Sequence, residues 1–362
     1  MNQAPIPWWY NEIGAAEKAG VLSCFEARTF SLGPEASALE SDLAERFNAA
    51  DAVVTNSGTS ALTMAMLAAG VGPGDEVVVP ALTWIASAQA AALLGAKVVL
   101  VDCLPDIPVI DPDAVSSVVT EETAAIVPVH LNGRPCNLDA LKPLADAVGA
   151  WIVEDTCKGM ASRTESGFLG TLANMGCFSM GMISLISVGY GGFLLTQDEC
   201  AAATLRSIRD HGVIRSPESY RHLGSNFKIS DMLAAVGRAQ LAALDKKIDH
   251  VVQVYRRYRD GLSDLASVDV MPIDVESGKI PIYTELRSKR REDLAAFLAD
   301  HAVQVSRWHL PLNTAAYLGA EGDFPNATAL SSECMIIPSG PSQPLENVDV
   351  CIELIRQWDS KG

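Results

Sequence analysis

Short runs of apolar and β-branched residues alternate with helix-like segments through the first half of the chain, and this alternation limits the possible folds most. The runs that predict strands are Ala52–Thr55, Glu76–Pro80, Lys97–Asp102, Ala124–His130 and Trp151–Val153. Strands that are apolar on both sides belong to a sheet that is buried on both faces. We therefore predict an α/β fold with a mostly parallel sheet that is covered by helices on both faces.

The chain changes character in its last third. Ser230, followed by Asp231, is predicted to cap a long helix that runs through Tyr258. From Val268 onwards, short strands and helices are separated by Pro-rich links. We therefore predict two domains, a large α/β domain over residues 1–235 and a smaller α+β domain over residues 236–362.

The most informative stretch is Trp151–Thr196. Its apolar opening run ends in two carboxylates, Glu154 and Asp155, and a glycine-rich turn at residues 189–192 precedes its last strand. A buried strand that ends in an acid presents that acid to a ligand at the carboxyl edge of the sheet. The small, sulfur-bearing and hydroxylic residues around Cys177–Ser179 are predicted to form a loop-rich segment between the two ends.

A turn rich in Gly, Ser and Thr follows the first predicted strand. Residues 56–60 read Asn-Ser-Gly-Thr-Ser and lead directly into a helix. A strand, such a turn and a helix together aim backbone N–H groups and the helix N-terminus at an anion. Gly58 would allow close approach, and Thr59 and Ser60 would add hydroxyl donors. Ser and Thr also serve as ordinary helix caps, so the turn alone leaves both interpretations open.

Charge and cysteine usage exclude several classes of protein. Lys and Arg number 27 against 44 Asp and Glu, which gives a net charge of −17. A chain with this negative charge is not expected to bind nucleic acid or an anionic membrane surface. The eight cysteines show neither CxxC pairs nor His partners at zinc spacing, so we expect no metal site and reduced thiols. With no secretory signal and no apolar run of membrane-spanning length, the sequence predicts a cytoplasmic protein.

Several motifs, taken together, carry a family resemblance that extends over nearly the whole chain. The chain closely resembles the sugar aminotransferases of the DegT/StrS type, on the motifs Ser57–Leu62, Gly72–Val77, Pro80–Trp84, Val129–Gly133, Glu154-Asp155 and Gly224–Asp231. Those proteins are enzymes of pyridoxal-phosphate (PLP) fold type I that act on keto sugars attached to nucleotides. The resemblance implies an aspartate-aminotransferase-like large domain, a cytoplasmic homodimer with shared active sites, and a nucleotide-sugar-like substrate.

The resemblance also implies roles for individual residues. The cofactor phosphate would be held by Gly58, Thr59, Ser60 and Ser179, together with Asn226 of the partner subunit. Trp84 would stack on the pyridine ring. Asp155 would form a salt bridge with the ring nitrogen and keep it protonated, so that the ring can act as an electron sink.

The lysine that this family requires is absent. In the family pattern Phe-Ser-Phe-x-x-x-Lys the lysine forms a Schiff base with PLP, and a Gly-Glu-Gly-Gly motif follows it. The corresponding run here, Phe178–Ser184, has Ser184 in the lysine position, and Tyr190 replaces the glutamate. A hydroxyl cannot form a Schiff base and is a poor base near neutral pH. A deliberate single substitution at 184 would not account for Tyr190.

Two other lysines could compensate. Lys158 lies three residues after Asp155, where the family usually has Gln or His beside the 3-hydroxyl of the cofactor. Its amine could take over the Schiff-base role, or its charge could only neutralise the phenolate. Lys228 is interpreted as a phosphate or interface charge. Arg307, Trp308 and His309 lie where family members carry a substrate-facing loop, but they could equally cap the small domain.

Two classes of function remain open. The first is an enzyme that uses PLP or pyridoxamine phosphate (PMP) with altered chemistry, either amino transfer with Lys158 or a PMP-dependent dehydration. A sugar 3-dehydratase of this family has His in the lysine position. The second is a non-catalytic binding or regulatory scaffold. Retention of Trp84, Asp155, Ser179, Asn226 and the Gly58 turn favours an enzyme that still binds the cofactor.

Overall fold

The central sheet of the computed structural model, which describes residues 5–215 and 218–361, has the strand order β1–β9–β8–β5–β4–β2–β3. The pairs β2–β3, β2–β4, β4–β5 and β5–β8 are parallel, whereas β8–β9 and β1–β9 are antiparallel. The predicted mostly parallel sheet is therefore confirmed. The strands are β1 Asp51–Thr55, β2 Glu76–Pro80, β3 Lys97–Val101, β4 Thr123–Ile126, β5 Trp151–Asp155, β8 Met175–Ser179 and β9 Gly192–Thr196.

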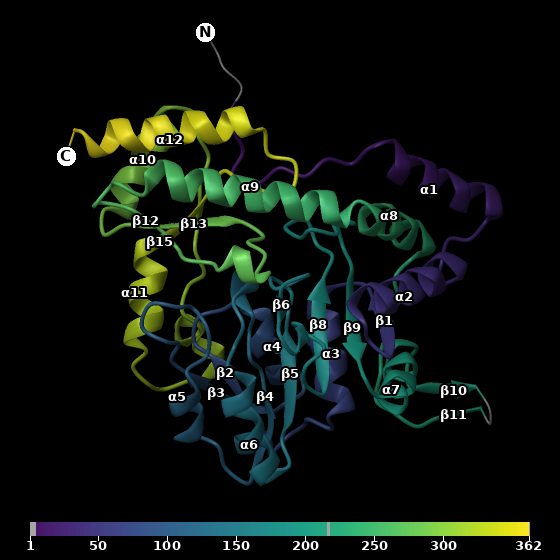
Figure 1. Cartoon of the computed structure of the whole chain (residues 1–362). Helices are drawn as coiled ribbons and strands as arrows, with labels where there is room; N and C mark the ends of the chain where they lie inside the picture. The colour runs from purple at the N-terminus through teal and green to yellow at the C-terminus, as the bar shows by residue number, and fades with distance from the viewer. Residues whose placement is uncertain (1–4, 216–217, 362) are drawn as a thin grey trace.

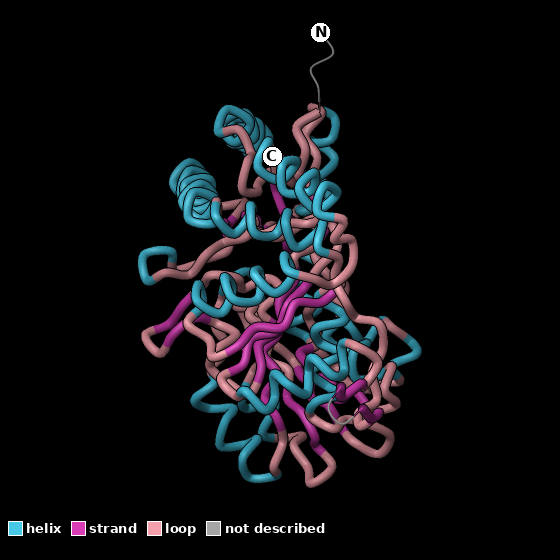
Figure 2. Tube along the Cα trace, turned by 90° about the vertical axis from the view of Figure 1, so that its right-hand side faces the viewer, coloured by secondary structure: helices cyan, strands magenta, loops and turns pink. Residues whose placement is uncertain are grey.

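The apolar runs form strands because helices cover both faces of this sheet (Figure 2). Val77, Val79 and Val153 share a core with α3 and α4 on one face, and the intervening residues Val78 and Ile152 pack with α5 and α6 on the other. The helices of this part are α1 Ala15–Ala27, α2 Pro34–Phe47, α3 Gly58–Ala68, α4 Ala86–Ala92, α5 Pro112–Ser116, α6 Leu138–Val148 and α7 Glu199–Arg209.

Two expectations about secondary structure are wrong. Residues 177–179, which we expected in a loop, lie in β8, because the run from Met175 to Phe178 is buried between β5 and β9. The helix expected from Ser230 through Tyr258 is broken into α8 Asp231–Ala242 and α9 Leu244–Leu262. Ser230 does cap α8, since its side chain accepts a hydrogen bond from the N–H of Leu233.

The C-terminal part builds a second sheet with the order β12–β13–β15–β14, packed against α9, α10 and α12. In Figure 1, α9 and α12 lie side by side above both sheets. The elements are β12 Asp269–Val270, β13 Thr284–Arg287, β14 Ser306–Arg307, β15 Cys334–Ile337, α10 Arg291–Asp300, α11 Pro325–Glu333 and α12 Leu345–Asp359. The predicted division after residue 235 falls inside α8 and stays a prediction.

Paired polar contacts join the second sheet to the large sheet. The amide of Asn132 donates to the carbonyl of Tyr283 (2.8 Å) and accepts from its N–H (3.2 Å). Arg134 forms a buried ion pair with Glu285, at 2.6 Å. The N–H of Leu312 donates to the carbonyl of Ala81, at 2.8 Å. These contacts bring the segment around residue 309 against the loop that follows β2.

Smaller elements complete the fold. The hairpin of β10 Val213–Arg215 and β11 Glu218–Tyr220 projects from the body beside α7 (Figure 1). The pair β6 Arg163–Thr164 and β7 Gly167–Phe168 follows β5, and short 3₁₀ turns lie at Leu131–Gly133, Val275–Ser277, Leu312–Thr314 and Ala316–Leu318. No helix in the described part of the chain is long and apolar enough to cross a bilayer.

Candidate active site

Asp155 ends β5 on the face of the sheet that α3 and α4 cover. Side chains alternate along a strand, so Asp155 faces the same side as Val153. It is 4% exposed. Its Oδ2 accepts a hydrogen bond from the hydroxyl of Ser87 (2.7 Å), and its Oδ1 accepts one from the N–H of Cys157 (3.1 Å). No ion pair to Asp155 occurs among residues 5–215 and 218–361, so its negative charge is buried without a direct cation.

Ser87 links Asp155 to Trp84. The N–H and the hydroxyl of Ser87 both lie 3.2 Å from the carbonyl oxygen of Trp84, in the first turn of α4. The indole itself is 62% exposed. A large exposed aromatic ring beside a buried carboxylate suits a flat, charged ligand. Sequence analysis missed Ser87 because nothing local distinguishes it from an ordinary helix residue.

The Gly58 turn and Ser179 meet at the same carboxyl edge of the sheet as Asp155, since β1, β8 and β5 run in the same direction. A Cβ atom on Gly58 would lie 2.9 Å from the Cβ of Ser179 and 3.0 Å from the sulfur of Cys157. The hydroxyl of Ser57 caps α3 by accepting from the N–H of Ser60, at 3.0 Å. Only glycine therefore allows the helix N-terminus to approach the end of β8 so closely. Thr59 follows Gly58 in the first turn of α3.

Ser184 is 0% exposed, and its Oγ has no hydrogen-bond partner among the residues that the structure describes. Two lysine side chains reach the carbonyls on either side of it. The Nζ of Lys158 donates to the carbonyl of Ile183, and that of Lys247 donates to the carbonyl of Leu185 (2.9 Å). Ser184 is thus flanked by two lysine amines from other parts of the chain. Lys247 is the second residue that sequence analysis missed.

The Lys158 amine is easy to deprotonate. Burial lowers its pKa from 10.5 to about 8, although the charge of Asp155 acts in the opposite direction. Lys158 therefore holds or releases a proton near neutral pH, which the Ser184 hydroxyl cannot do. The structure supports both a charge contact with the Ile183 carbonyl and a reactive amine, so the two interpretations of Lys158 stay open.

His309 reaches this site from the C-terminal part of the chain. Its ring centroid lies 5.8 Å from that of Trp84, and the two rings are tilted by 62°. Its Nε2 is buried and has no hydrogen-bond partner within the described part of the chain. Burial and, to a lesser extent, the charge of Lys158 lower its pKa from 6.5 to about 4, so the ring is neutral at physiological pH.

Other predicted positions lie at the rim. Asn226 is exposed, and its carbonyl accepts from the side chain of Asn56 (3.3 Å), which precedes the Gly58 turn. The role of Asn226 in the phosphate site of a partner subunit stays a prediction. Lys228 forms an ion pair with Asp210, at 2.6 Å. Tyr190 is 80% exposed.

Glu154 has a structural role. Its carboxylate is fully buried and accepts hydrogen bonds of 2.8 Å from the N–H groups of Gly170, Leu172 and Ala173, and it pairs with His130 at 2.9 Å. Nδ1 of His130 accepts from the N–H of Cys136, so its Nε2 donates to Glu154. Of the two acids that end β5, only Asp155 therefore faces the site.

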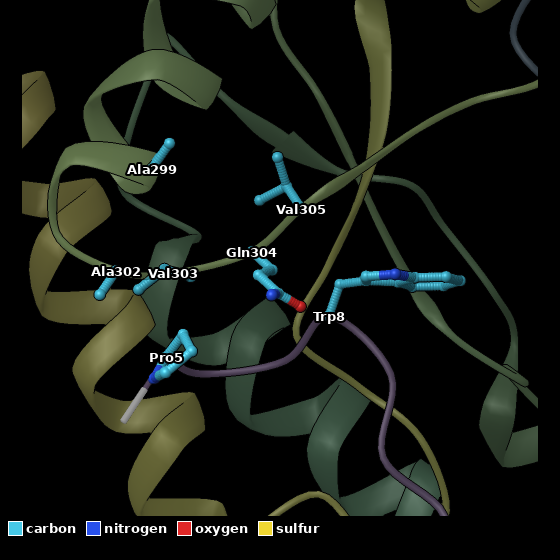
Figure 3. A pocket seen from close by; sticks show the side chains of 7 residues that line it. All are labelled: Pro5, Trp8, Ala299, Ala302, Val303, Gln304 and Val305. Atoms are coloured by element: carbon cyan, nitrogen blue, oxygen red, sulfur yellow. The ribbon is translucent and has the colours of Figure 1, made fainter. Parts of the chain in front are cut away.

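A hollow of about 530 Å³ lies elsewhere, between the N-terminal segment and the end of α10 (Figure 3). Its lining carries no charged side chain and consists of Pro5, Trp8, Ala299, Ala302, Val303, Gln304 and Val305. It therefore lacks the acid and the amines that the region around Asp155 offers.

The chain is similar to known proteins over nearly its whole length. The model of the DegT/DnrJ/EryC1/StrS aminotransferase family matches residues 11–356. A dTDP-3-amino-3,4,6-trideoxy-alpha-D-glucose transaminase of Streptomyces venezuelae is 32% identical over 96% of this chain and 93% of its own length. The crystal structure of S. venezuelae DesV aligns with a TM-score of 0.92 at 31% identity, covering 99% of both chains. A 3-amino-5-hydroxybenzoic acid synthase aligns with a TM-score of 0.90 at 28% identity, covering 99% of this chain and 100% of its own.

Proposed function

Because the chain belongs to the DegT/DnrJ/EryC1/StrS aminotransferase family, we propose that it binds PLP or PMP and acts on a nucleotide-linked keto sugar without a lysine at position 184. The family is PLP-dependent. When bound, the cofactor supplies an electron sink for the charge that develops at the reacting carbon. The nucleotide-sugar part of the proposal rests on the relatives, such as the S. venezuelae transaminase.

The buried carboxylate of Asp155 is the observation that carries the proposal. It lies without a direct cation, and a buried charge needs compensation. A protonated ring nitrogen would supply that cation, and the carboxylate would in turn keep the nitrogen protonated. The hydrogen bonds from Ser87 and Cys157 hold the carboxylate in place. These residues fit the cofactor.

The other end of the cofactor has a matching cradle. Gly58 lets the N-terminus of α3 approach Ser179 closely, and a Cβ at position 58 would fill that space. Backbone N–H groups at a helix N-terminus bind phosphate well. Gly58, Thr59, Ser60 and Ser179 would therefore hold the phosphate, and Trp84 would cover the ring.

Lys158 would take over the proton transfer for which the family uses a lysine at the position of Ser184. With a pKa of about 8, its Nζ can accept or give a proton near neutral pH. Ser184 would only fill space, since its hydroxyl is buried and is a weak base. A homodimer, with Asn226 of the partner subunit completing each phosphate site, belongs to the same proposal.

Cofactor binding tests the proposal. We expect the purified protein to bind PLP and PMP, measured by absorbance and fluorescence titration, and Gly58→Val to abolish binding while the protein stays folded. Borohydride reduction followed by peptide mapping then asks which amine, if any, carries PLP. Lys247 is the matched control, because its pKa is also about 8 and it also flanks Ser184.

Each outcome separates two interpretations. Label on Lys158 supports a reactive amine, whereas binding without label supports the charge contact and a PMP-dependent reaction. If neither cofactor binds at millimolar concentration, the proposal is wrong and the non-catalytic scaffold is favoured.

A further inference from the structure

The N-terminal segment is bonded to the C-terminal part of the chain through its backbone. The carbonyl of Trp8 accepts from the N–H of Ser339, at 2.9 Å, and the N–H of Tyr10 donates to the carbonyl of the same residue, at 3.1 Å. Further upstream, Ile6 pairs with Val303 in a parallel bridge. The residue between Trp8 and Tyr10 therefore has a fixed backbone, which sets the direction of its side chain.

This residue is Trp9, and its indole reaches the large domain. Its Nε1 donates to the carbonyl of Met182, at 2.9 Å, across 173 positions of the sequence. The ring is half-buried and packs against the core that contains α3 and α4. One side chain thus connects the C-terminal part of the chain to the segment around Ser184.

The carbonyl that Trp9 holds lies next to the one that holds Lys158. The peptide plane of the Met182 carbonyl includes the N and Cα atoms of Ile183, so the two residues move together. The carbonyl of Ile183 accepts from the Nζ of Lys158, and it is the only hydrogen-bond acceptor of that amine within the described part of the chain. Because a lysine stem is long and flexible, the place of this acceptor decides where the amine lies.

The titratable groups around Lys158 do not fix its amine. They are Asp155, Cys157 and His309. Burial raises the pKa of the Cys157 thiol, and burial lowers the pKa of His309 to about 4, so both are neutral near pH 7. The charge of Asp155 attracts the amine without a hydrogen bond between them among the described residues. The directional contact is the one with the Ile183 carbonyl.

We propose that Trp9 is a positioning residue, which holds the carbonyl of Met182 and thereby keeps the neighbouring carbonyl of Ile183 in place for the Lys158 amine. This inference rests on the proposed function, in which Lys158 transfers a proton. It adds to that function a residue of the N-terminal segment that acts through the backbone of residues 182 and 183.

Two substitutions separate the hydrogen bond of Trp9 from the packing of its ring. Trp9→Phe keeps an aromatic ring and removes the donor. Trp9→Gln removes the ring and keeps a donor, because the Nε2 of glutamine stands the same number of bonds from Cα as the Nε1 of tryptophan. Trp8→Phe is the matched control, since the N–H of that neighbouring indole makes no hydrogen bond among the described residues, and its ring lines the hollow of Figure 3.

The test measures the reactivity of single lysine amines without any cofactor. Each full-length protein is acetylated with a limiting amount of acetic anhydride over a range of pH, and peptide mass spectrometry gives the rate at every lysine. The midpoint of each pH profile gives the pKa of the amine, and the plateau at high pH gives the rate of its neutral form. Lys247 is the internal reference, because its pKa is also about 8 and its acceptors, Leu185 and Gln240, make no hydrogen bond with Trp9 among the described residues. Exposed Lys246 normalises the rates.

In Trp9→Phe we expect the contact of Lys158 to open more often. One neutral hydrogen bond corresponds to roughly a 5-fold change in such an equilibrium, so the plateau rate at Lys158 should rise by about that factor. Its midpoint should move up from about 8, because the opened amine is less buried. Trp9→Gln should stay close to wild type at Lys158, and Lys247 should be unchanged in all variants.

The inference is overturned if Trp9→Phe leaves the Lys158 profile unchanged, or if Trp8→Phe changes it equally. Parallel changes at Lys158 and Lys247 would also overturn it, since they indicate a general loosening of the fold. If Trp9→Gln is folded in a urea titration but behaves as Trp9→Phe does, ring packing is the cause and the inference is wrong; if it does not fold, the comparison of Trp9→Phe with Trp8→Phe decides.

Failure of the proposed function gives a different result. In that case neither PLP nor PMP binds the wild-type protein in a titration, although Trp9→Phe still changes the Lys158 profile.

Discussion

The buried amine of Lys247 makes the stability of the fold depend on pH in a predictable direction. Lys247 is 7% exposed, and burial lowers its pKa from 10.5 to about 8. Between these two values the unfolded chain binds more protons than the folded one, so stability rises as the pH rises. A difference of about 2.5 pH units corresponds to about 3 kcal/mol, and about 2 kcal/mol of it is recovered between pH 7 and 9.5.

Replacing Lys247 by Met removes the charge and also a donor. The Gln240 oxygen to which Nζ also donates keeps the N–H of Ser187 as a donor. The carbonyl of Leu185 loses its bond from Nζ, and an unpaired buried acceptor costs about 1–3 kcal/mol. Since removal of the buried charge gains a similar amount, we expect Lys247→Met to change the free energy of unfolding little at pH 7. The difference appears at pH 9.5, where the wild-type protein has gained about 2 kcal/mol and the variant has not.

Urea unfolding at pH 7, 8, 9 and 9.5, followed by circular dichroism, measures this difference. Lys246→Met is the control, because Lys246 is the exposed neighbour of Lys247 and should leave the pH slope unchanged. Parallel pH profiles for wild type and Lys247→Met would refute the reasoning, since they would mean that burial does not disfavour the charged amine. The result bears on Lys158, whose pKa is lowered by the same cause.

Three further predictions concern the site. Asp155→Asn should weaken PMP binding by roughly 10- to 100-fold in a fluorescence titration, because it removes a charge-assisted hydrogen bond, and equal affinity would contradict the role of Asp155. Ser184→Lys should lower the melting temperature, because a long cationic side chain enters a fully buried position near Lys158, and adding Lys158→Gln should restore part of the loss. Glu154→Gln should lower the free energy of unfolding, measured with urea, by about 3–5 kcal/mol, because the carboxylate pairs with His130 and accepts hydrogen bonds from three backbone N–H groups. A loss below about 1 kcal/mol would contradict the structural role of Glu154.

The large sheet could be predicted because most of its strands have a local sequence pattern that is typical of a buried strand. Runs such as Glu76–Pro80 are apolar on both sides, and turns with Gly, Ser or Asp bound them. β8 could not be recognised, since Gly176 and Ser179 have low strand propensity. β8 is extended because it pairs with β5 on one side and β9 on the other. Gly170 also packs closely against it, since its carbonyl oxygen would lie 2.0 Å from a Cβ on Gly176.

In the candidate site, too, only residues with a local sequence signal could be predicted. Asp155 and the Gly58 turn stand at strand ends, where an α/β sheet places ligands, so the sequence points to them directly. Ser87 and Lys247 carry no such signal, because their roles depend on contacts with residues 68 and 62 positions away. Likewise, the free Nε2 of His309 follows from the packing of two distant segments. Tertiary contacts, rather than local pattern, assign these side chains to the site.

The segment around Ser184 is held in place by donors from three other parts of the chain. The Nε1 of Trp9 donates to the carbonyl of Met182 (2.9 Å), Lys158 to that of Ile183, and Lys247 to that of Leu185. These donors come from the N-terminal segment, from the turn that follows β5 and from α9, so the segment is fixed from three directions. These contacts are intrinsic to the protein, so they hold the segment from Met182 to Leu185 without help from a ligand.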